Sequence, residues 1–169
     1  MNAPVTRFRP DAGNTRLLRD AFGRFTTGVT VVTAMSEDGP VGITANSFTS
    51  VSLDPAMVLW SPSKSSRRFP YFDKAEHFAI HVLAANQEAL CWGFAKDAFA
   101  LKDMALDLNA EGVPVLGNTL ARFECKQAAK FNGGDHRIIL GEVLRAEMRD
   151  GDGLVFFGGK HGVFSKVED

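Results

Sequence analysis

The amino-acid sequence predicts a mainly β protein, an antiparallel barrel with peripheral helices. Short segments rich in Val and Thr recur between turn signals, as in Gly28–Ala34. A long hairpin of alternating apolar and polar residues begins near Ala121. The strands do not alternate with long helices, as parallel βαβ units would require. An antiparallel barrel therefore fits the pattern best.

At the N-terminal end of the chain, the sequence predicts an irregular segment followed by a helix. Residues 1–13 hold two prolines and a glycine and are expected to form a flexible lead-in. Residues 14–169 are expected to form a single domain, because the chain length suits one domain and no linker interrupts the pattern. A helix is predicted from Thr15, with Asn14 as its cap and with an apolar face made of Leu17, Ala21, Phe22 and Phe25.

The middle of the chain predicts short strands separated by turns, a loop and two short helices. The second strand segment is broken near Asn46-Ser47, and residues 63–75 are expected to be a loop leading into a short helix. A further helix is predicted over 86–96, with Asn86 as its cap. The predicted strands cover 28–34, 41–52, 56–61, 78–82, 154–157 and 162–164.

The long hairpin is the clearest element of the pattern. Alternation runs through 121–129, and Asn132-Gly133-Gly134-Asp135 predicts the turn. Gly141 indicates a β-bulge, because the alternation would otherwise place Glu142 on the apolar side. The side chains expected to share the apolar face of the return strand are Ile138, Leu140, Leu144, Ala146 and Met148.

Composition excludes several classes of function. The 19 Lys and Arg nearly balance the 20 Asp and Glu, so nothing in the charge points to nucleic acid. No apolar run reaches membrane-spanning length and no signal peptide is recognised, so no membrane partner is expected. The two cysteines lack metal-type spacing, so no metal site is predicted, and a cytoplasmic location is the simplest expectation, with one disulfide left open.

Common catalytic motifs are absent from the sequence. It contains no GxGxxG after a strand, no GxxxxGK[ST], no GxSxG and no HExxH. A Rossmann dinucleotide site, a P-loop, a serine-hydrolase elbow and a zinc protease are therefore not expected.

Residues 61–68, Ser-Pro-Ser-Lys-Ser-Ser-Arg-Arg, are the first candidate binding segment. Four hydroxyls and three cations follow an apolar strand and precede a short helix. Hydroxyls, cations and free amides at a helix start are the donors that a phosphate needs. A solvated basic loop fits the composition equally well, so both interpretations stay open.

Residues 44–50, Thr-Ala-Asn-Ser-Phe-Thr-Ser, are the second candidate segment. They form a polar stretch of small residues inside an apolar strand region. Polar groups on a barrel wall need hydrogen-bond partners, and a flat heterocycle with many acceptors would supply them. An edge strand with side-chain-stabilised turns is the ordinary alternative.

The histidines carry less information. His136 follows the Gly-Gly-Asp turn of the hairpin, where an exposed residue is the ordinary expectation. His77 and His81 are expected to be structural or surface residues, since no third metal ligand lies nearby in sequence. His161 lies among three glycines and is a candidate rim residue of a ligand site.

Taken together, these segments resemble the short-chain flavin reductase family, the reductase component of two-component flavin-dependent monooxygenases. The similarity extends from the first helix to Phe164, and the order and spacing of its motifs carry it. The family commonly has Asn at the position of His81, and the tail around His161 is less typical of it. The matching segments are Phe25–Thr33, Gly42–Phe48, Ser50–Pro55, Lys64–Ser66, Phe94-Ala95, Gly134–His136 and Gly141–Val143.

The resemblance implies a split β-barrel of the FMN-binding type that forms a homodimer. It implies FMN or FAD as the flavin, NADH or NADPH as hydride donor, and reduced flavin passed to a separate monooxygenase. It places His136 beside the nicotinamide and the flavin ring as the catalytic candidate. The flavin-binding residues that it implies are Thr44, Ala45, Asn46, Ser47 and Ser50 along the strand, and Ser61, Ser63, Lys64, Ser65, Ser66 and Arg67 around the phosphate.

The absence of the common catalytic motifs from the sequence agrees with this function. Hydride transfer to flavin is cofactor chemistry, for which the protein needs mainly to bind and orient the two cofactors. Two other functions remain alternatives. One is a flavoenzyme similar to pyridoxamine-phosphate oxidase, which would need a second cationic pocket. The other is a barrel that binds flavin or haem without catalysis.

Overall fold

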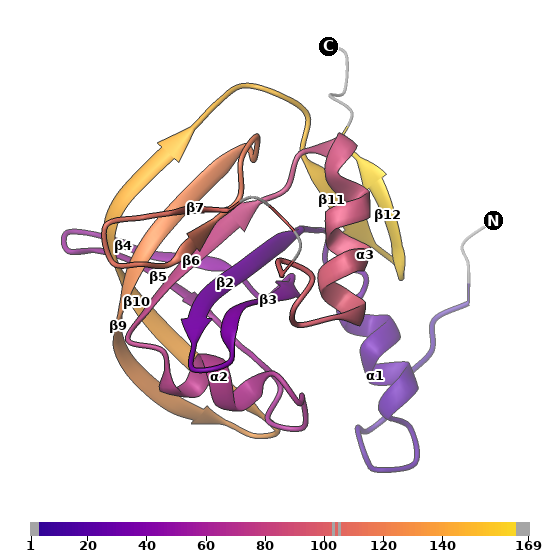
Figure 1. Cartoon of the computed structure of the whole chain (residues 1–169). Helices are drawn as coiled ribbons and strands as arrows, with labels where there is room; N and C mark the ends of the chain where they lie inside the picture. Colours follow the sequence, from indigo (N-terminus) through magenta and orange to yellow (C-terminus); the bar gives the residue numbers. More distant parts are fainter. Residues whose placement is uncertain (1–3, 103, 105, 165–169) are drawn as a thin grey trace.

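The computed structural model describes residues 4–102, 104 and 106–164. Its main element is a seven-stranded antiparallel sheet that curls around the core (Figure 1). The strand order is β3-β2-β6-β9-β10-β5-β4. Their bounds are β2 (Thr30–Ser36), β3 (Gly39–Ala45), β4 (Thr49–Leu53), β5 (Ala56–Trp60), β6 (His77–Val82), β9 (Ala121–Gly133) and β10 (His136–Met148).

The outer strands of this sheet, β3 and β4, follow each other along the chain but do not pair with each other. Residues 46–48 connect them without regular structure, as the predicted break near Asn46-Ser47 requires. The barrel is therefore open at this seam, and the prediction of a mainly β, antiparallel barrel is confirmed.

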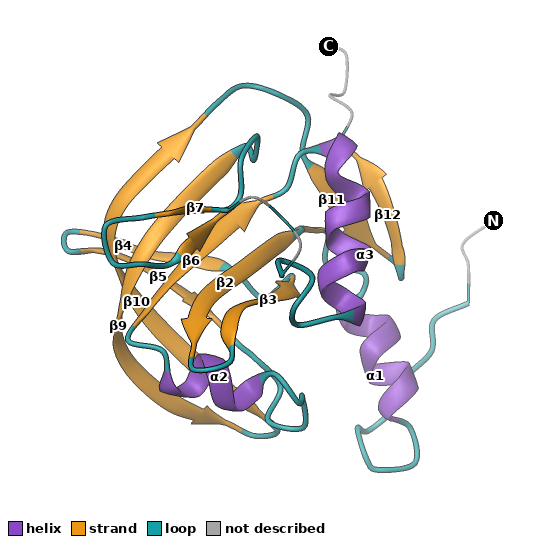
Figure 2. Ribbon diagram, in the orientation of Figure 1, coloured by secondary structure: helices purple, strands orange, loops and turns teal. Residues whose placement is uncertain are grey.

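Two small sheets and the helices lie at the periphery (Figure 2). A three-stranded sheet has the order β1-β11-β12, and a two-stranded sheet pairs β7 with β8. The sequence pattern missed β7 and β8. The bounds are β1 (Thr27–Gly28), β7 (Asp107–Leu108), β8 (Pro114–Val115), β11 (Leu154–Phe157), β12 (Lys160–Val163), α1 (Thr15–Phe22), α2 (Phe69–Lys74), η1 (Ala85–Gln87) and α3 (Glu88–Lys96).

The predicted helix caps are wrong in detail. Asn14 is the N-cap residue of α1, but its side chain makes no capping hydrogen bond and instead contacts the lead-in, at the carbonyl of Arg9. Asn86 lies inside the short 3₁₀ turn η1, and α3 begins only at Glu88. Short 3₁₀ turns are common at helix starts, where they move the boundary by a residue or two.

The hairpin β9–β10 is confirmed, with a tighter turn than predicted, because the strands pair up to Gly133 and His136. The pairing shifts between Leu140 and Gly141, so an irregularity does lie at the predicted place, but its extra residue is Ala128 of β9. A second shift follows Val143, and there the extra residue is Leu144 of β10. The predicted interior face of β10 is wrong. Ile139 is fully buried and packs in the main core, whereas Met148 is 89% exposed.

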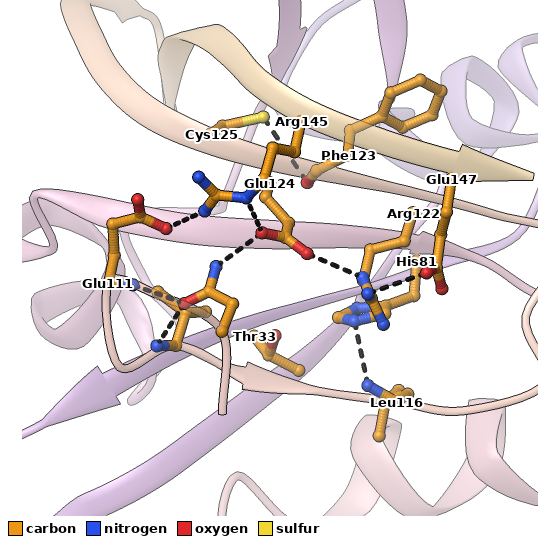
Figure 3. Close-up of polar contacts among 12 residues, drawn as sticks. Thr33, His81, Glu111, Leu116, Arg122, Phe123, Glu124, Cys125, Arg145 and Glu147 are labelled. Atoms are coloured by element: carbon orange, nitrogen blue, oxygen red, sulfur yellow. Dashed lines mark hydrogen bonds and ion pairs between the residues drawn. The ribbon is translucent and has the colours of Figure 1, made fainter. Parts of the chain in front are cut away.

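A buried carboxylate fixes the 107–116 segment against the outer face of the sheet (Figure 3). Glu124 of β9 accepts hydrogen bonds from Arg122 Nε at 3.1 Å and Arg145 Nε at 2.8 Å. It also accepts one from Asn109 Nδ2 at 3.1 Å, and Arg145 pairs in turn with Glu111. A buried charge with this many partners is satisfied, so the cluster holds the segment in place.

His81 anchors the end of the same segment. Its Nε2 accepts the backbone N–H of Leu116 at 3.1 Å, so its Nδ1 carries the proton and donates to the carbonyl of Val31, also at 3.1 Å. Burial lowers the pKa of His81 to about 4. His81 is therefore a neutral structural histidine, as the sequence predicted.

Candidate functional site

Three segments that are far apart in the sequence line one cavity of about 250 Å³ beside the open seam, which we call the hairpin cavity. The end of β3 and the connection to β4 form one wall, the loop after β5 forms the second, and the start of β10 forms the third. Its lining residues are Ile43, Thr44, Ala45, Asn46, Ser47, Trp60, Ser61, Pro62, Ser63, Ser66 and His136.

The loop that follows β5 is bound to the tip of the β9–β10 hairpin. Ser63 forms a β-bridge with His136, and the Lys64 backbone N–H donates to the Asp135 carbonyl at 2.9 Å. The Lys64 ammonium donates to the Gly134 carbonyl at 2.6 Å. The hairpin tip and the loop therefore form one unit, and part of the loop's cationic charge is used to hold it.

The donors of this loop fit an anion. The Ser63 and Ser65 hydroxyls lie 2.9 Å apart, and the Ser66 hydroxyl accepts the backbone N–H of Arg68. Within the described chain, the backbone N–H groups of Ser65 and Arg67 donate no hydrogen bond. Hydroxyls, free amides and nearby cations together can bind the phosphate of a flavin.

The remaining predicted phosphate residues lie outside the hairpin cavity. Ser65 and Arg67 line an adjoining cavity of about 560 Å³, and Ser66 lines both cavities. Lys64 is on the same loop but lines neither. Ser50, which the resemblance placed at the flavin, is exposed on β4 and is not part of the hairpin cavity lining.

Asn46 lies where three cavities meet. It lines the hairpin cavity, a second cavity of about 260 Å³, and a third of about 490 Å³ beside α1. Its side-chain amide makes no hydrogen bond within the described chain, whereas the Ser47 hydroxyl accepts the Ser61 N–H at 2.9 Å. Cofactor sites commonly occupy roughly 300–1,000 Å³, so a flavin needs adjoining cavities. A free amide at their junction suits the polar edge of a flavin ring.

His136 stands at the rim of the hairpin cavity. Its Nδ1 is 2.8 Å from Oδ1 of Asp135, and its side chain is 43% exposed. The hydrogen bond with His136 lowers the pKa of the Asp135 carboxyl. Asp135 therefore orients the imidazole, and Nε2 makes no hydrogen bond with any described residue, which leaves it available to a ligand.

His161 borders the second cavity, which we call the histidine cavity. It lines that cavity together with Val29, Thr44, Ala45, Asn46 and Phe156. The side chain is only 10% exposed and contacts α3. The sequence named His161 as a rim candidate but gave no sign of its partners on α3.

The sequence missed the apolar side chains that shape the two cavities. Ile43 and Trp60 line the hairpin cavity, while Val29 and Phe156 line the histidine cavity. Trp60 comes directly before the serine-rich loop, so the end of an apolar strand was the available signal. Phe156 gives no such signal, because it meets the site only through the pairing of β11 with β1.

The described residues do not support a metal site, a disulfide or a membrane-spanning helix. No group of three or more His, Cys, Asp or Glu among them is arranged to hold a metal ion. Both cysteines, Cys91 and Cys125, are free and buried. None of the described helices has the length and apolar character needed to cross a bilayer.

Comparison with known proteins identifies relatives of this chain. The chain is 58% identical over 159 residues to "FMN reductase (NADH) SmoA" of Agrobacterium fabrum, covering 94% of this chain and 91% of that protein. It is 34% identical to "Flavin-dependent monooxygenase, reductase subunit HsaB" of Rhodococcus jostii, covering 89% of this chain and 78% of that protein.

A solved structure has the same fold as this chain. The Streptomyces globisporus NADH:FAD oxidoreductase SgcE6 superposes with a TM-score of 0.89 and 37% identity, over 99% of this chain and 97% of that one. The family model described as "Flavin reductase like domain" matches residues 22–164. The chain therefore belongs to the flavin reductase family.

Proposed function

We propose that this chain is an NADH:flavin oxidoreductase that binds FMN or FAD across the hairpin and histidine cavities. The observation that carries this proposal is the hairpin cavity itself. Family-like segments from β3, from the loop after β5 and from the start of β10 meet there around one space. NADH is the proposed hydride donor, because two of the relatives named above, SmoA and SgcE6, carry NADH in their names.

Each wall of the site has its own part in this function. Thr44, Ala45, Asn46 and Ser47 border the flavin ring and its ribityl chain. Ser61, Ser63 and Ser66, with the amides of Ser65 and Arg67, hold the phosphate, and Lys64 keeps this loop against the hairpin. The bound flavin supplies the electron-accepting chemistry, taking the hydride that nicotinamide gives up.

The protein's contribution is to position the two cofactors. His136, oriented by Asp135, offers Nε2 to the nicotinamide at the rim. Such a contact fixes the distance and angle between the reacting rings, which is where an enzyme of this kind gains rate. No described side chain has to transfer a proton for this role.

The proposed partners are a second copy of this chain and a separate monooxygenase. Helix α1 buries none of its residues, and Phe22 and Phe25 are 68% and 77% exposed beside the cavity that Asn46 borders. A second copy would cover this surface and complete the site. The relative from Rhodococcus jostii is by name the reductase subunit of a monooxygenase, which supports reduced flavin as the product handed on.

The cytoplasm, where NADH is available, is the proposed compartment. We also propose that the described residues from 14 onward form one domain, with residues 4–13 as its lead-in; the predicted ends of the lead-in and of the domain, 1–3 and 165–169, lie outside the described residues. The family model matches from residue 22, which agrees with a domain that begins near α1.

Steady-state oxidation of NADH with added FMN or FAD tests the function. We expect flavin-dependent turnover well above the rate without protein. An oxidase similar to pyridoxamine-phosphate oxidase would instead consume oxygen with an organic amine substrate, and a flavin- or haem-binding protein would show no turnover. Absence of turnover with NADH or NADPH and either flavin would refute the proposal.

A further inference from the structure

The first turn of α3 contacts two separate walls of the histidine cavity. The Thr44 hydroxyl of β3 donates to the Cys91 carbonyl at 2.6 Å. The Cys91 sulfur lies 3.5 Å from Nε2 of His161 on β12. Figure 1 shows α3 running beside β11 and β12. One residue of the helix therefore contacts two strands that both border the cavity, β3 and β12.

Glu88, one turn before Cys91, contacts the other nitrogen of the same imidazole. Its Oε1 lies 3.2 Å from Nδ1 of His161 and also accepts the indole N–H of Trp92 at 3.2 Å. These hydrogen bonds, first from Trp92 and then from His161, lower the pKa of the Glu88 carboxyl. Glu88 is therefore a carboxylate, which can only accept hydrogen bonds.

These contacts determine which nitrogen of His161 carries the proton. Because a carboxylate cannot donate, Nδ1 must be the protonated nitrogen. Burial raises the pKa of the Cys91 thiol, so the sulfur keeps its proton and can donate to Nε2. Both nitrogens are then engaged within the protein, and aromatic contacts with Trp92 and Phe156 hold the ring at 5.0 and 5.6 Å between centroids.

We propose that Glu88 is a positioning residue, which holds His161 in its Nδ1–H form as a fixed wall of the histidine cavity and so sets how the flavin is held for reduction. This inference rests on the proposed function. Under this inference, His136 and His161 have different roles in the site. His136 offers a free nitrogen at the rim, whereas His161 offers a ring whose nitrogens are both engaged.

Two conservative variants distinguish the effect of the length of the Glu88 side chain from the effect of its charge. Glu88→Gln removes the charge and keeps a side-chain oxygen, which the indole N–H of Trp92 still orients, while the Cys91 thiol still donates to Nε2 and leaves Nδ1 as the protonated nitrogen. Glu88→Asp keeps the charge and is too short to reach His161. We expect the flavin dissociation constant and the single-turnover reduction rate of Glu88→Gln to stay within about threefold of wild type. Glu88→Asp and His161→Ala should slow reduction roughly 10-fold or more, the scale of a small misplacement of the reacting groups.

Nitrogen-15 NMR of the imidazoles tests the same inference without flavin or NADH. The chain has only four histidines, so His161→Ala assigns the relevant signals directly. We expect a protonated Nδ1 and an unprotonated Nε2 for His161 in the wild type and in Glu88→Gln, and loss of that pattern in Glu88→Asp. The control is Glu37→Ala, an exposed carboxylate paired with Lys74 and lining neither of the two cavities.

The outcomes distinguish this inference from the proposed function. If wild-type protein does not reduce flavin, the proposed function fails, whatever the NMR shows. If wild-type protein is active, a protonated Nε2 on His161 overturns the positioning role. Equal activity and flavin affinity in Glu88→Asp and wild type would overturn it too, as would a Glu88→Gln variant as impaired as Glu88→Asp.

Discussion

Ser63 pairs with His136 across a single β-bridge, so the serine-rich loop and the rim histidine move as one unit. The Arg137 N–H adds a hydrogen bond to the Pro62 carbonyl at 3.0 Å. The loop proposed to bind the phosphate therefore also supports the imidazole at the rim. In the proposed site, the side chains that bind flavin and the side chain that positions the nicotinamide therefore share one structural support.

Replacing His136 with Ala should slow flavin reduction and leave flavin affinity nearly unchanged. The imidazole is at the cavity rim and offers one free nitrogen, so its loss removes one positioning contact. We expect a reduction rate lower by ~10–100-fold, the scale of a misplacement of about 1 Å. Single-turnover stopped-flow measurements with preloaded flavin test this. An unchanged rate together with an unchanged NADH dissociation constant would show that His136 is only a surface residue.

Replacing Lys64 and Ser66 together with Ala should weaken the binding of FMN far more than that of riboflavin. The Ser66 hydroxyl is a proposed direct contact of the phosphate, and a hydrogen bond to a charged group contributes about 1.5–3 kcal/mol, or roughly 10–150-fold in the dissociation constant. Lys64 holds the loop against the hairpin through the Gly134 carbonyl, so its loss should loosen the phosphate loop further. Fluorescence titration with the two flavins measures the difference. Lys74→Ala, which removes an exposed cation on α2, is the control. Equal weakening of FMN and riboflavin would show that the loop supports the cavity without binding the phosphate.

The positions of most strands along the chain could be predicted from local patterns, but the side of β10 that faces the core could not. Residues 138–140 are all apolar, so either alternation fits them. Ile139 is fully buried, and the pairing shift after Val143 leaves Leu144 of β10 without a partner, which interrupts the alternation of the later part of the strand. The far end of the strand then runs past the core, which leaves Met148 exposed. A period-of-two argument cannot show where a strand leaves the core.

The site could be predicted as a set of segments, but not as a set of contacts. The stretch from Thr44 to Ser47 and the serine-rich loop do meet around one cavity, because β4 and β5 return the chain to the seam. The Lys64 ammonium, however, binds the Gly134 carbonyl, and His161 contacts Glu88 and Cys91. Those partners come from strand pairing and helix packing over long sequence separations, which a single sequence does not reveal.

Replacing Phe25 with Ser should dissociate the proposed homodimer. Phe25 is 77% exposed beside a cavity that Asn46 also lines, so a second copy covering it would stabilise both the surface and the site. We expect wild-type protein to scatter light as a dimer at micromolar concentration and the variant to be monomeric with weaker flavin binding. Circular dichroism should stay unchanged, since Phe25 buries little surface in the isolated chain. A fully active wild-type monomer would contradict this prediction.

Replacing Gly42 with Ala and replacing Gly93 with Ala should change the free energy of unfolding in opposite directions. A Cβ at Gly42 would lie 2.5 Å from the ring of Phe94, which is buried and cannot move away. Such overpacking should lower the free energy of unfolding by about 1–3 kcal/mol. A Cβ at Gly93, inside α3, meets nothing within 4 Å and should raise it by about 0.5–1 kcal/mol. Urea unfolding measures both, and a Gly42→Ala variant as stable as Gly93→Ala would contradict the packing between β3 and α3.

The buried His81 should make the protein less stable in mild acid. Its pKa is about 4 in the folded state against 6.5 ordinarily, so the unfolded chain binds more protons between these values. The free energy of unfolding is therefore highest above about pH 6.5 and falls as the pH drops towards 4. Protonation would also force Nε2 to give up the N–H of Leu116. We expect this group alone to account for a loss of about 2 kcal/mol between about pH 7 and pH 5. Urea unfolding at both pH values measures the loss, and His81→Asn, which cannot titrate, should be less stable at neutral pH but lose less on acidification. An equal loss in the two proteins would mean that other groups cause the acid sensitivity.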